Sequence, residues 1–172
     1  DGGITDNLGL RAMLDTIELV GGIRQYRQVE GVPTPRRIAI ISVNASADTP
    51  LGIGSTDRSP SIEETLNAVT NIQLHRYNVA TLQQMQVRMA QWSEQLSTPE
   101  RPVSSYFIKL SFEGVPDGPL RRFLNEIPTS FSLSDEQVDQ LIATGRELLR
   151  SNPDYQRLLS SLGATVAPAA VT

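Results

Sequence analysis

Residues 36–45 read RRIAIISVNA, a run of apolar and β-branched side chains that two arginines precede and a polar loop follows. A strand buried on both faces has this composition, because helices cover both sides of a parallel sheet. Residues 46–60 are rich in Asp, Gly, Pro, Ser and Thr, which predicts a long loop. We therefore expect residues 36–45 to form a strand of a parallel sheet that helices cover.

Helical patterns lie on both sides of this strand. Apolar side chains recur every three to four positions over residues 10–19, and Gly21 and Gly22 end that run. The longest helical signal covers residues 61–96, which Ser61 and Glu64 open with a capping-box pattern. Its apolar stripe consists of Leu82, Met85, Met89, Trp92 and Leu96. The stretch is either one helix or two helices that break at Tyr77 and Asn78.

A second strand is predicted at residues 105–112, where alternate residues are apolar, and we expect it nearer an edge of the sheet than the first. Helices are predicted at residues 120–127, from Ser134 to the Asn152-Pro153 pair, and at residues 154–162. The second of these has Ser134 and Gln137 as a capping box. The residues expected on its apolar face are Val138, Leu141, Ile142, Gly145 and Leu148. Strands separated by helices predict an α/β layer architecture.

Two strands make a poor sheet, because a parallel pair needs neighbours and two covering layers. The chain has 172 residues, which suits one domain or part of a larger one. It begins at Asp1 without an initiator methionine or an apolar signal segment. We therefore expect a preceding N-terminal portion to supply the rest of the sheet.

Composition excludes several kinds of chemistry. The net charge is −4, from 15 basic and 19 acidic groups without a basic cluster, so a nucleic-acid partner is not expected. The absence of cysteine excludes disulfides, thiol catalysis and cysteine-bound metals. His75 is the only histidine, so a zinc site built from several histidines is excluded too. No stretch approaches the roughly 20 apolar residues of a membrane-spanning helix.

The first ten residues, DGGITDNLGL, carry the main candidate for catalysis. Gly2 and Gly3 follow the carboxylate of Asp1, and residues without side chains allow another segment to approach closely. An aspartate held in such a turn can orient or deprotonate a serine hydroxyl. The structural alternative is that Asp1 caps the helix that follows. Spacing alone leaves both interpretations open.

This opening resembles the DGG segment of the patatin-like phospholipases, in their bacterial branch, where DGG, a short spacer and Asp-Asn lead into a helix. Residues 36–46 resemble a buried strand of that family, and residues 127–139 resemble the start of its C-terminal helix. The resemblance implies a three-layer α/β/α patatin-like fold, of which residues 1–163 are the C-terminal part. Residues 164–172 are expected to form a disordered tail.

The resemblance also implies an activity. In that family the DGG aspartate and a serine in a Gly-x-Ser-x-Gly turn form a dyad without histidine, which hydrolyses lipid esters. The resemblance therefore implies that Asp1 is the acid of the dyad and that Gly2 and Gly3 shape its turn. No Gly-x-Ser-x-Gly occurs in the 172 residues, so the nucleophile and the oxyanion hole would lie in the preceding portion. We expect this chain alone to be inactive, and the chemistry needs no metal or organic cofactor.

A second function class stays open, a non-catalytic lipid-binding or protein-interaction module without the nucleophile. Arg121 and Arg122 suggest a peripheral contact with phospholipid headgroups, although a solvated helix face is the safer interpretation. Met85, Met89 and Trp92 could line an acyl pocket or simply form core.

The remaining candidates have structural explanations. His75 is expected to be partly buried and hydrogen-bonded rather than catalytic. Asp6 lies near Asp1 and could join it at a cation, but two carboxylates make a weak calcium site. Asn7 suits a turn, and Gly52-Ile53-Gly54 suits a flexible loop rather than a nucleotide site.

Overall fold

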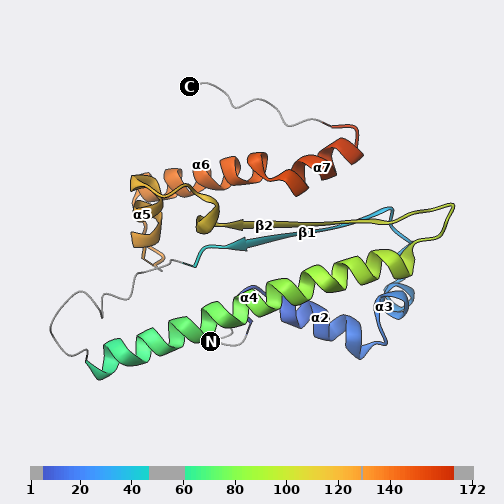
Figure 1. Ribbon diagram of the computed structural model, residues 1–172, viewed down its shortest axis with the longest axis horizontal. Coiled ribbons are helices and arrows are strands. Elements are labelled where there is room, and N and C mark those ends of the chain that lie inside the picture. The colour runs from blue at the N-terminus through green and yellow to red at the C-terminus, as the bar shows by residue number, and fades with distance from the viewer. Residues whose placement is uncertain (1–5, 47–60, 129, 165–172) are drawn as a thin grey trace. The chain divides into compact units, whose positions relative to one another are not determined.

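The computed structural model describes residues 6–46, 61–128 and 130–164, without the side chains of residues 63, 64, 66–68 and 71 (Figure 1). The chain divides into two compact units. The first comprises Asp1–Ile38 and Pro50–Ser105, and the second comprises Ala39–Thr49 and Tyr106–Thr172. Helices and a two-stranded parallel sheet together confirm the α/β class.

The first unit contains α2 (Leu10–Leu19), α3 (Ile23–Val29) and α4 (Ile62–Leu96). Helix α2 buries Leu10, Leu14 and Ile17, the face that the apolar spacing predicts. Gly21 and Gly22, both at φ 96°, end it, because residues with a Cβ rarely adopt that conformation. Helix α3 was not predicted. It buries none of its residues, so the apolar periodicity that reveals a packed helix is missing.

Helix α4 is continuous from Ile62 to Leu96, so the alternative of a break at Tyr77 and Asn78 is wrong. Asn78 is only 5% exposed and begins the buried face. The predicted apolar stripe continues that face: Leu82 is half-buried, and Met85, Met89, Trp92 and Leu96 are buried. A second apolar set on the helix is exposed: Ile62, Val69, Ile72, Val79 and Val87. The side chain of Glu64, half of the predicted capping box, lies outside the described residues.

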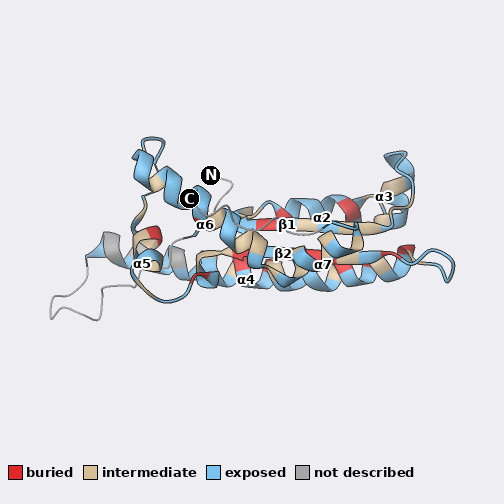
Figure 2. Ribbon diagram, turned by 90° about the horizontal axis from the view of Figure 1, so that it is seen from above, coloured by how far each residue is buried: buried red, intermediate tan, exposed pale blue. Residues whose placement is uncertain are grey.

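Strands β1 (Arg37–Asn44) and β2 (Ser104–Ser111) form the parallel sheet (Figure 1). Strand β2 buries Tyr106, Ile108 and Leu110 on one face, at 8% exposure or less. On its other face Phe107 is 7% exposed, whereas Lys109 is exposed. In β1 only Ser42 is buried, and Ile41 and Val43 are 49% and 66% exposed (Figure 2).

The prediction that β1 is buried on both faces is therefore wrong. The alternation predicted for β2 is confirmed by its buried face, and its place nearer a sheet edge stays a prediction, because both strands are edges of a two-stranded sheet. The burial of β1 was mispredicted because the apolar composition of a strand shows only which of its side chains are suited to burial. Neighbouring elements decide what it does bury, and the described residues leave one face of β1 open.

The second unit continues with a 3-10 turn, η2 (Phe112–Gly114), then α5 (Pro119–Glu126), α6 (Asp135–Ser151) and α7 (Pro153–Ser161). The capping box of α6 is confirmed: Gln137 N donates to Ser134 Oγ at 3.3 Å, and Ser134 N donates to Gln137 Oε1 at 2.9 Å. The predicted apolar face of α6 is only partly correct. Val138 and Ile142 are 40% and 45% exposed, whereas Thr144 is buried, because the helix meets its neighbours on the side of Thr144.

Asn152 connects α7 to the sheet. Its Oδ1 accepts hydrogen bonds from the backbone N–H groups of Asp154 at 2.9 Å and Tyr155 at 3.1 Å. Its Nδ2 donates to the carbonyl oxygen of Lys109 in β2 at 3.2 Å. A second contact joins the same elements, since the Arg157 guanidinium lies 5.8 Å from the centroid of the Tyr106 ring.

We predict that Asn152→Ala lowers the free energy of unfolding by about 1–2 kcal/mol, because the helix cap and the hydrogen bond to β2 are lost together. Asn152→Asp keeps the acceptor oxygens and should lose less. Urea denaturation followed by circular dichroism measures both variants. Equal losses for the two variants would mean that the Nδ2 bond, not the cap, stabilises this junction.

Candidate functional site

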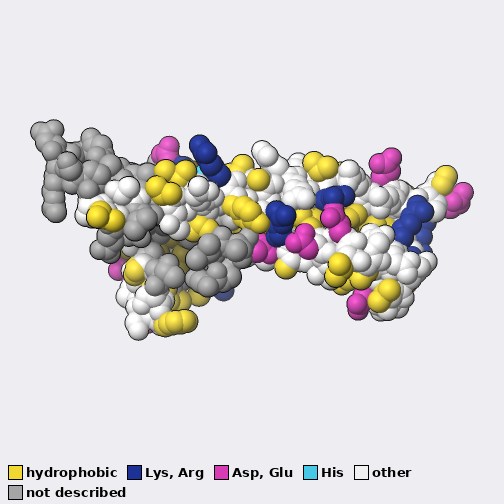
Figure 3. Space-filling model, turned by 90° about the horizontal axis from the view of Figure 1, so that it is seen from below, with side chains coloured by type: hydrophobic (Ala, Val, Ile, Leu, Met, Phe, Trp, Pro, Cys, Tyr) yellow, Lys and Arg dark blue, Asp and Glu magenta, His cyan; other side chains and the backbone are white. Residues whose placement is uncertain are grey.

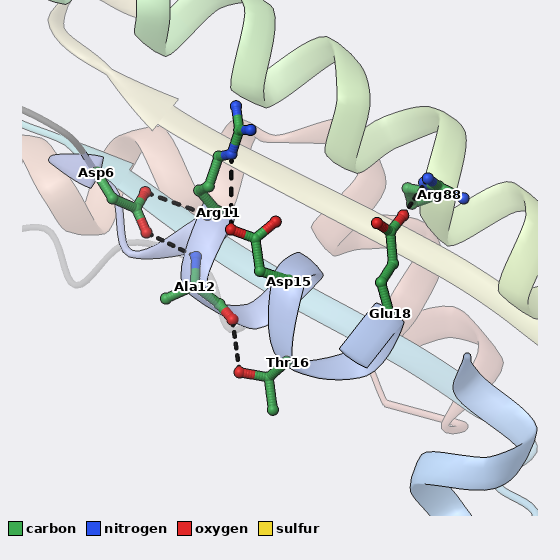
Figure 4. A network of polar contacts seen from close by, with 7 residues as sticks. All are labelled: Asp6, Arg11, Ala12, Asp15, Thr16, Glu18 and Arg88. Atoms are coloured by element: carbon green, nitrogen blue, oxygen red, sulfur yellow. Dashed lines mark hydrogen bonds and ion pairs between the residues drawn. The ribbon is translucent and has the colours of Figure 1, made fainter. Parts of the chain in front are cut away.

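Asp6 begins the turn that leads into α2 (Figure 4). Its Oδ1 accepts a hydrogen bond from Arg11 N at 3.1 Å, and its Oδ2 accepts one from Ala12 N at 2.8 Å. Its carbonyl oxygen accepts a third from Gly9 N at 3.1 Å, and Gly9 adopts the left-handed conformation with φ 66°. Two N–H groups of the first helical turn, which have no acceptor within the helix, thereby gain one. The negative charge of the Asp6 carboxylate also lies at the positive end of the helix dipole.

Apolar packing and polar contacts attach α2 to α4 within the first unit. Leu10, Leu14 and Ile17 are each 5% exposed or less. Burying such side chains contributes about 1.5–3 kcal/mol each, which makes packing the largest stabilising contribution here.

Polar contacts also join α2 to α4, beside the apolar packing. The Arg11 guanidinium lies 5.9 Å from the centroid of the Tyr77 ring on α4, and its Nε lies 3.7 Å from Asp15 Oδ2. Glu18 forms an ion pair with Arg88 of α4 (Figure 4). Both side chains of that pair are more than one-third exposed, so it contributes at most about 1 kcal/mol. Helix α2 is therefore held along its whole length, from Arg11 to Glu18.

The residues predicted for catalysis, Asp1, Gly2 and Gly3, lie outside the described residues. Asn7 lies in an exposed turn, as expected. Asp6 has a role that the sequence analysis missed, although an aspartate shortly before an apolar-periodic run is a recognised sign of a helix start. Both of its carboxylate oxygens accept backbone N–H groups, which argues against a primary role as a cation ligand. In the described part of the chain, no group of three or more His, Asp or Glu residues could hold a metal ion.

His75 is exposed, so the prediction of a partly buried histidine is wrong. The buried face of α4 begins at Asn78, and every described side chain before it on that helix is exposed or half-buried. Met85 and Met89 are at most 1% exposed and Trp92 is 6% exposed, as core residues are. The segment Gly52-Ile53-Gly54 lies outside the described residues.

The two arginines of α5 differ from one another. Arg121 Nη1 lies 2.6 Å from Asp117 Oδ1, in an i,i+4 ion pair. Arg122 is exposed. On the face that Figure 3 shows, basic side chains lie among acidic ones rather than in a separate patch. Among the described helices, none combines the length and the hydropathy that crossing a membrane requires.

No family model matches this chain, and comparisons with curated proteins and with solved structures find no similar protein.

Proposed function

We propose that this chain is the C-terminal part of a serine acyl hydrolase with a three-layer α/β/α patatin-like fold, which cleaves carboxylic ester bonds of lipids. Asp1 is the acid of its Ser-Asp dyad, and Gly2 and Gly3 shape the turn that presents Asp1. The serine and the oxyanion hole belong to a preceding portion of the same polypeptide. The substrate is a lipid or other fatty-acyl ester, met at a peripheral membrane contact, and no cofactor takes part.

The observation that carries this proposal is the carboxylate cap at Asp6. Two N–H groups in the first turn of α2, those of Arg11 and Ala12, donate to the Asp6 carboxylate at 3.1 and 2.8 Å. Capping α2 therefore does not require the carboxylate of Asp1, which weakens the structural alternative for that residue. The DGG segment precedes a helix that is fixed by packing and by two contacts with α4.

The open face of β1 supports the proposal that further sheet is supplied from outside this chain. Parallel sheets are covered on both faces, and isolated pairs of strands are marginally stable. Ile41 and Val43 are 49% and 66% exposed, although apolar β-branched side chains suit a covered strand. A preceding portion that packs on β1 would bury them.

The chemistry follows from a serine and a carboxylate alone. Asp1 accepts the proton of the serine Oγ–H as Oγ attacks the ester carbonyl carbon, and the C–O bond to the alcohol then breaks. The alcohol leaves with that proton, and an acyl-serine remains. Asp1 next accepts a proton from water while the water oxygen attacks the acyl carbon. The fatty acid leaves, and Oγ regains its proton from Asp1.

A fluorophosphonate probe tests the proposal on the parent polypeptide, meaning the complete translated product that contains these 172 residues. We expect covalent labelling of one serine in a Gly-x-Ser-x-Gly turn upstream of Asp1, together with hydrolysis of p-nitrophenyl butyrate. The 172-residue chain should show neither reaction.

Absence of both reactions in the parent polypeptide, or of the Gly-x-Ser-x-Gly turn, would contradict the enzyme proposal. Co-sedimentation of that unreactive polypeptide with phosphatidylcholine vesicles would instead support the non-catalytic lipid-binding module.

A further inference from the structure

We infer that the first half of α4 binds a second copy of this chain, as an antiparallel pair of helices related by a two-fold axis. The surface concerned, here called the outer stripe, has six exposed side chains, of which four are apolar. Its members are Ile62, Thr65, Val69, Ile72, Arg76 and Val79. Alternating steps of three and four residues are the pattern of helices that pair as a coiled coil.

The outer stripe lies on the opposite side of α4 from the face that is packed in the first unit. Helix positions advance by about 100° a residue, so Val69 lies about 180° from the buried Asn78. Helix α2 meets α4 at Tyr77 and Arg88. Val79 lies about 200° from Tyr77 by the same rule. The packing of α2 therefore leaves the side of the outer stripe accessible.

Helix α4 is also far longer than the helix that packs against it. It has 35 residues and α2 has 10, which correspond to roughly 52 and 15 Å. Figure 1 shows α2 beside the later part of α4, in agreement with the contacts at Tyr77 and Arg88. The earlier part of α4, which carries the outer stripe, extends beyond α2 and can meet another helix along its length.

One antiparallel register matches every apolar residue of the outer stripe with another apolar residue. In this register the two-fold axis passes between residues 70 and 71, and each pair forms twice. The opposing residues are Ile62 and Val79, Val69 and Ile72, and Thr65 and Arg76. A slip of one heptad would instead place Ile62 opposite Gln86. The stripe is therefore complementary to a reversed copy of itself, which identifies a second copy as its partner.

The charges of this segment favour the antiparallel orientation. Parallel pairing in register would place Arg76 beside Arg76 of the second copy, and like charges repel. Antiparallel pairing separates the two arginines and places each opposite Thr65. The acidic residues among residues 61–79 are Glu63 and Glu64, in the first turn of α4. Antiparallel pairing brings this acidic end of one helix to the Arg76 end of the other, so the charges are complementary.

Analytical ultracentrifugation of the 172-residue chain and of the parent polypeptide tests the inference. We expect a monomer–dimer equilibrium in both. Val69→Asp should raise the dissociation constant about 100-fold, because the two-fold symmetry places each change in the interface twice. Val87→Asp is the matched control: it makes the same change on the same helix outside the paired segment, at 57% rather than 51% exposure. It should leave the dissociation constant within about twofold of wild type.

Cross-linking tests the orientation, since the chain has no cysteine of its own. Thr65→Cys and Arg76→Cys chains of different tag length are mixed and treated with a short bis-maleimide. Antiparallel pairing predicts cross-links between the two different variants. Cross-links within each variant instead would show parallel pairing and would overturn the proposed register.

The experiment needs no enzymatic activity, so its outcome is separate from that of the proposed hydrolase. A 172-residue chain that stays monomeric would overturn the inference, as would a dimer that Val69→Asp and Val87→Asp weaken equally. A monomeric parent polypeptide would overturn it too. Slow maleimide labelling of Thr65→Cys in that monomer would show that the preceding portion, rather than a second copy, covers the outer stripe.

Discussion

Asp1→Asn in the parent polypeptide should lower kcat for p-nitrophenyl butyrate about 1,000-fold, because general-base catalysis contributes about 100- to 10,000-fold. Asparagine has nearly the same shape as aspartate, but its amide cannot accept the serine proton at neutral pH. Without a histidine partner in the dyad, no other residue of the proposed mechanism can take over that proton.

Asp15→Asn provides the matched carboxylate control on the helix that follows. The Asp15 side chain is 65% exposed, and its Oδ2 lies 3.7 Å from the Nε of Arg11. Its loss should leave kcat unchanged. Both variants should melt within a few degrees of wild type by circular dichroism. If Asp1→Asn kept wild-type kcat, the aspartate would not be the dyad base, and a structural role for Asp1 would be favoured.

The sequence predicted helices best where a local signal marked their ends. Gly21 and Gly22 end α2 as expected, because a positive φ is costly for any residue with a Cβ. Ser134 and Gln137 form the predicted capping box, because both halves of that motif lie within one turn. Helix α3 lacked such evidence, since it buries no residue and has no side-chain cap. Helix starts and ends are local properties, so one chain segment suffices to predict them.

Burial was predicted less well, because it depends on elements far away in the sequence. Ile41 in β1 and Ile142 in α6 belong to apolar patterns, yet they are 49% and 45% exposed. Asn78 and Thr144 are polar, yet they are 5% and 7% exposed. For the candidate site, the motif directed attention to Asp1, whereas the structure identifies Asp6 as the residue that holds the helix start.

Ile108→Ala should lower the free energy of unfolding by about 2–5 kcal/mol, the usual cost of truncating a fully buried isoleucine. Ile108 is 0% exposed in β2, so the removed atoms leave a cavity that the surrounding residues fill only partly. Ile41→Ala makes the same chemical change in the paired strand, at a side chain that is 49% exposed. In the 172-residue chain we expect Ile41→Ala to cost less than about 1 kcal/mol, as substitutions at exposed positions usually do.

The same two variants in the parent polypeptide test whether the proposed preceding portion covers β1. Ile108 is already fully buried, so its cost should stay the same in both polypeptides. Ile41 would become buried, and its cost should rise to about 2 kcal/mol or more. Urea denaturation measures these differences when each variant is compared with the unsubstituted protein, once in the 172-residue chain and once in the parent polypeptide. An unchanged, small cost of Ile41→Ala would show that this face of β1 stays open in the longer protein, because newly buried methyl groups cannot be removed without loss of stability.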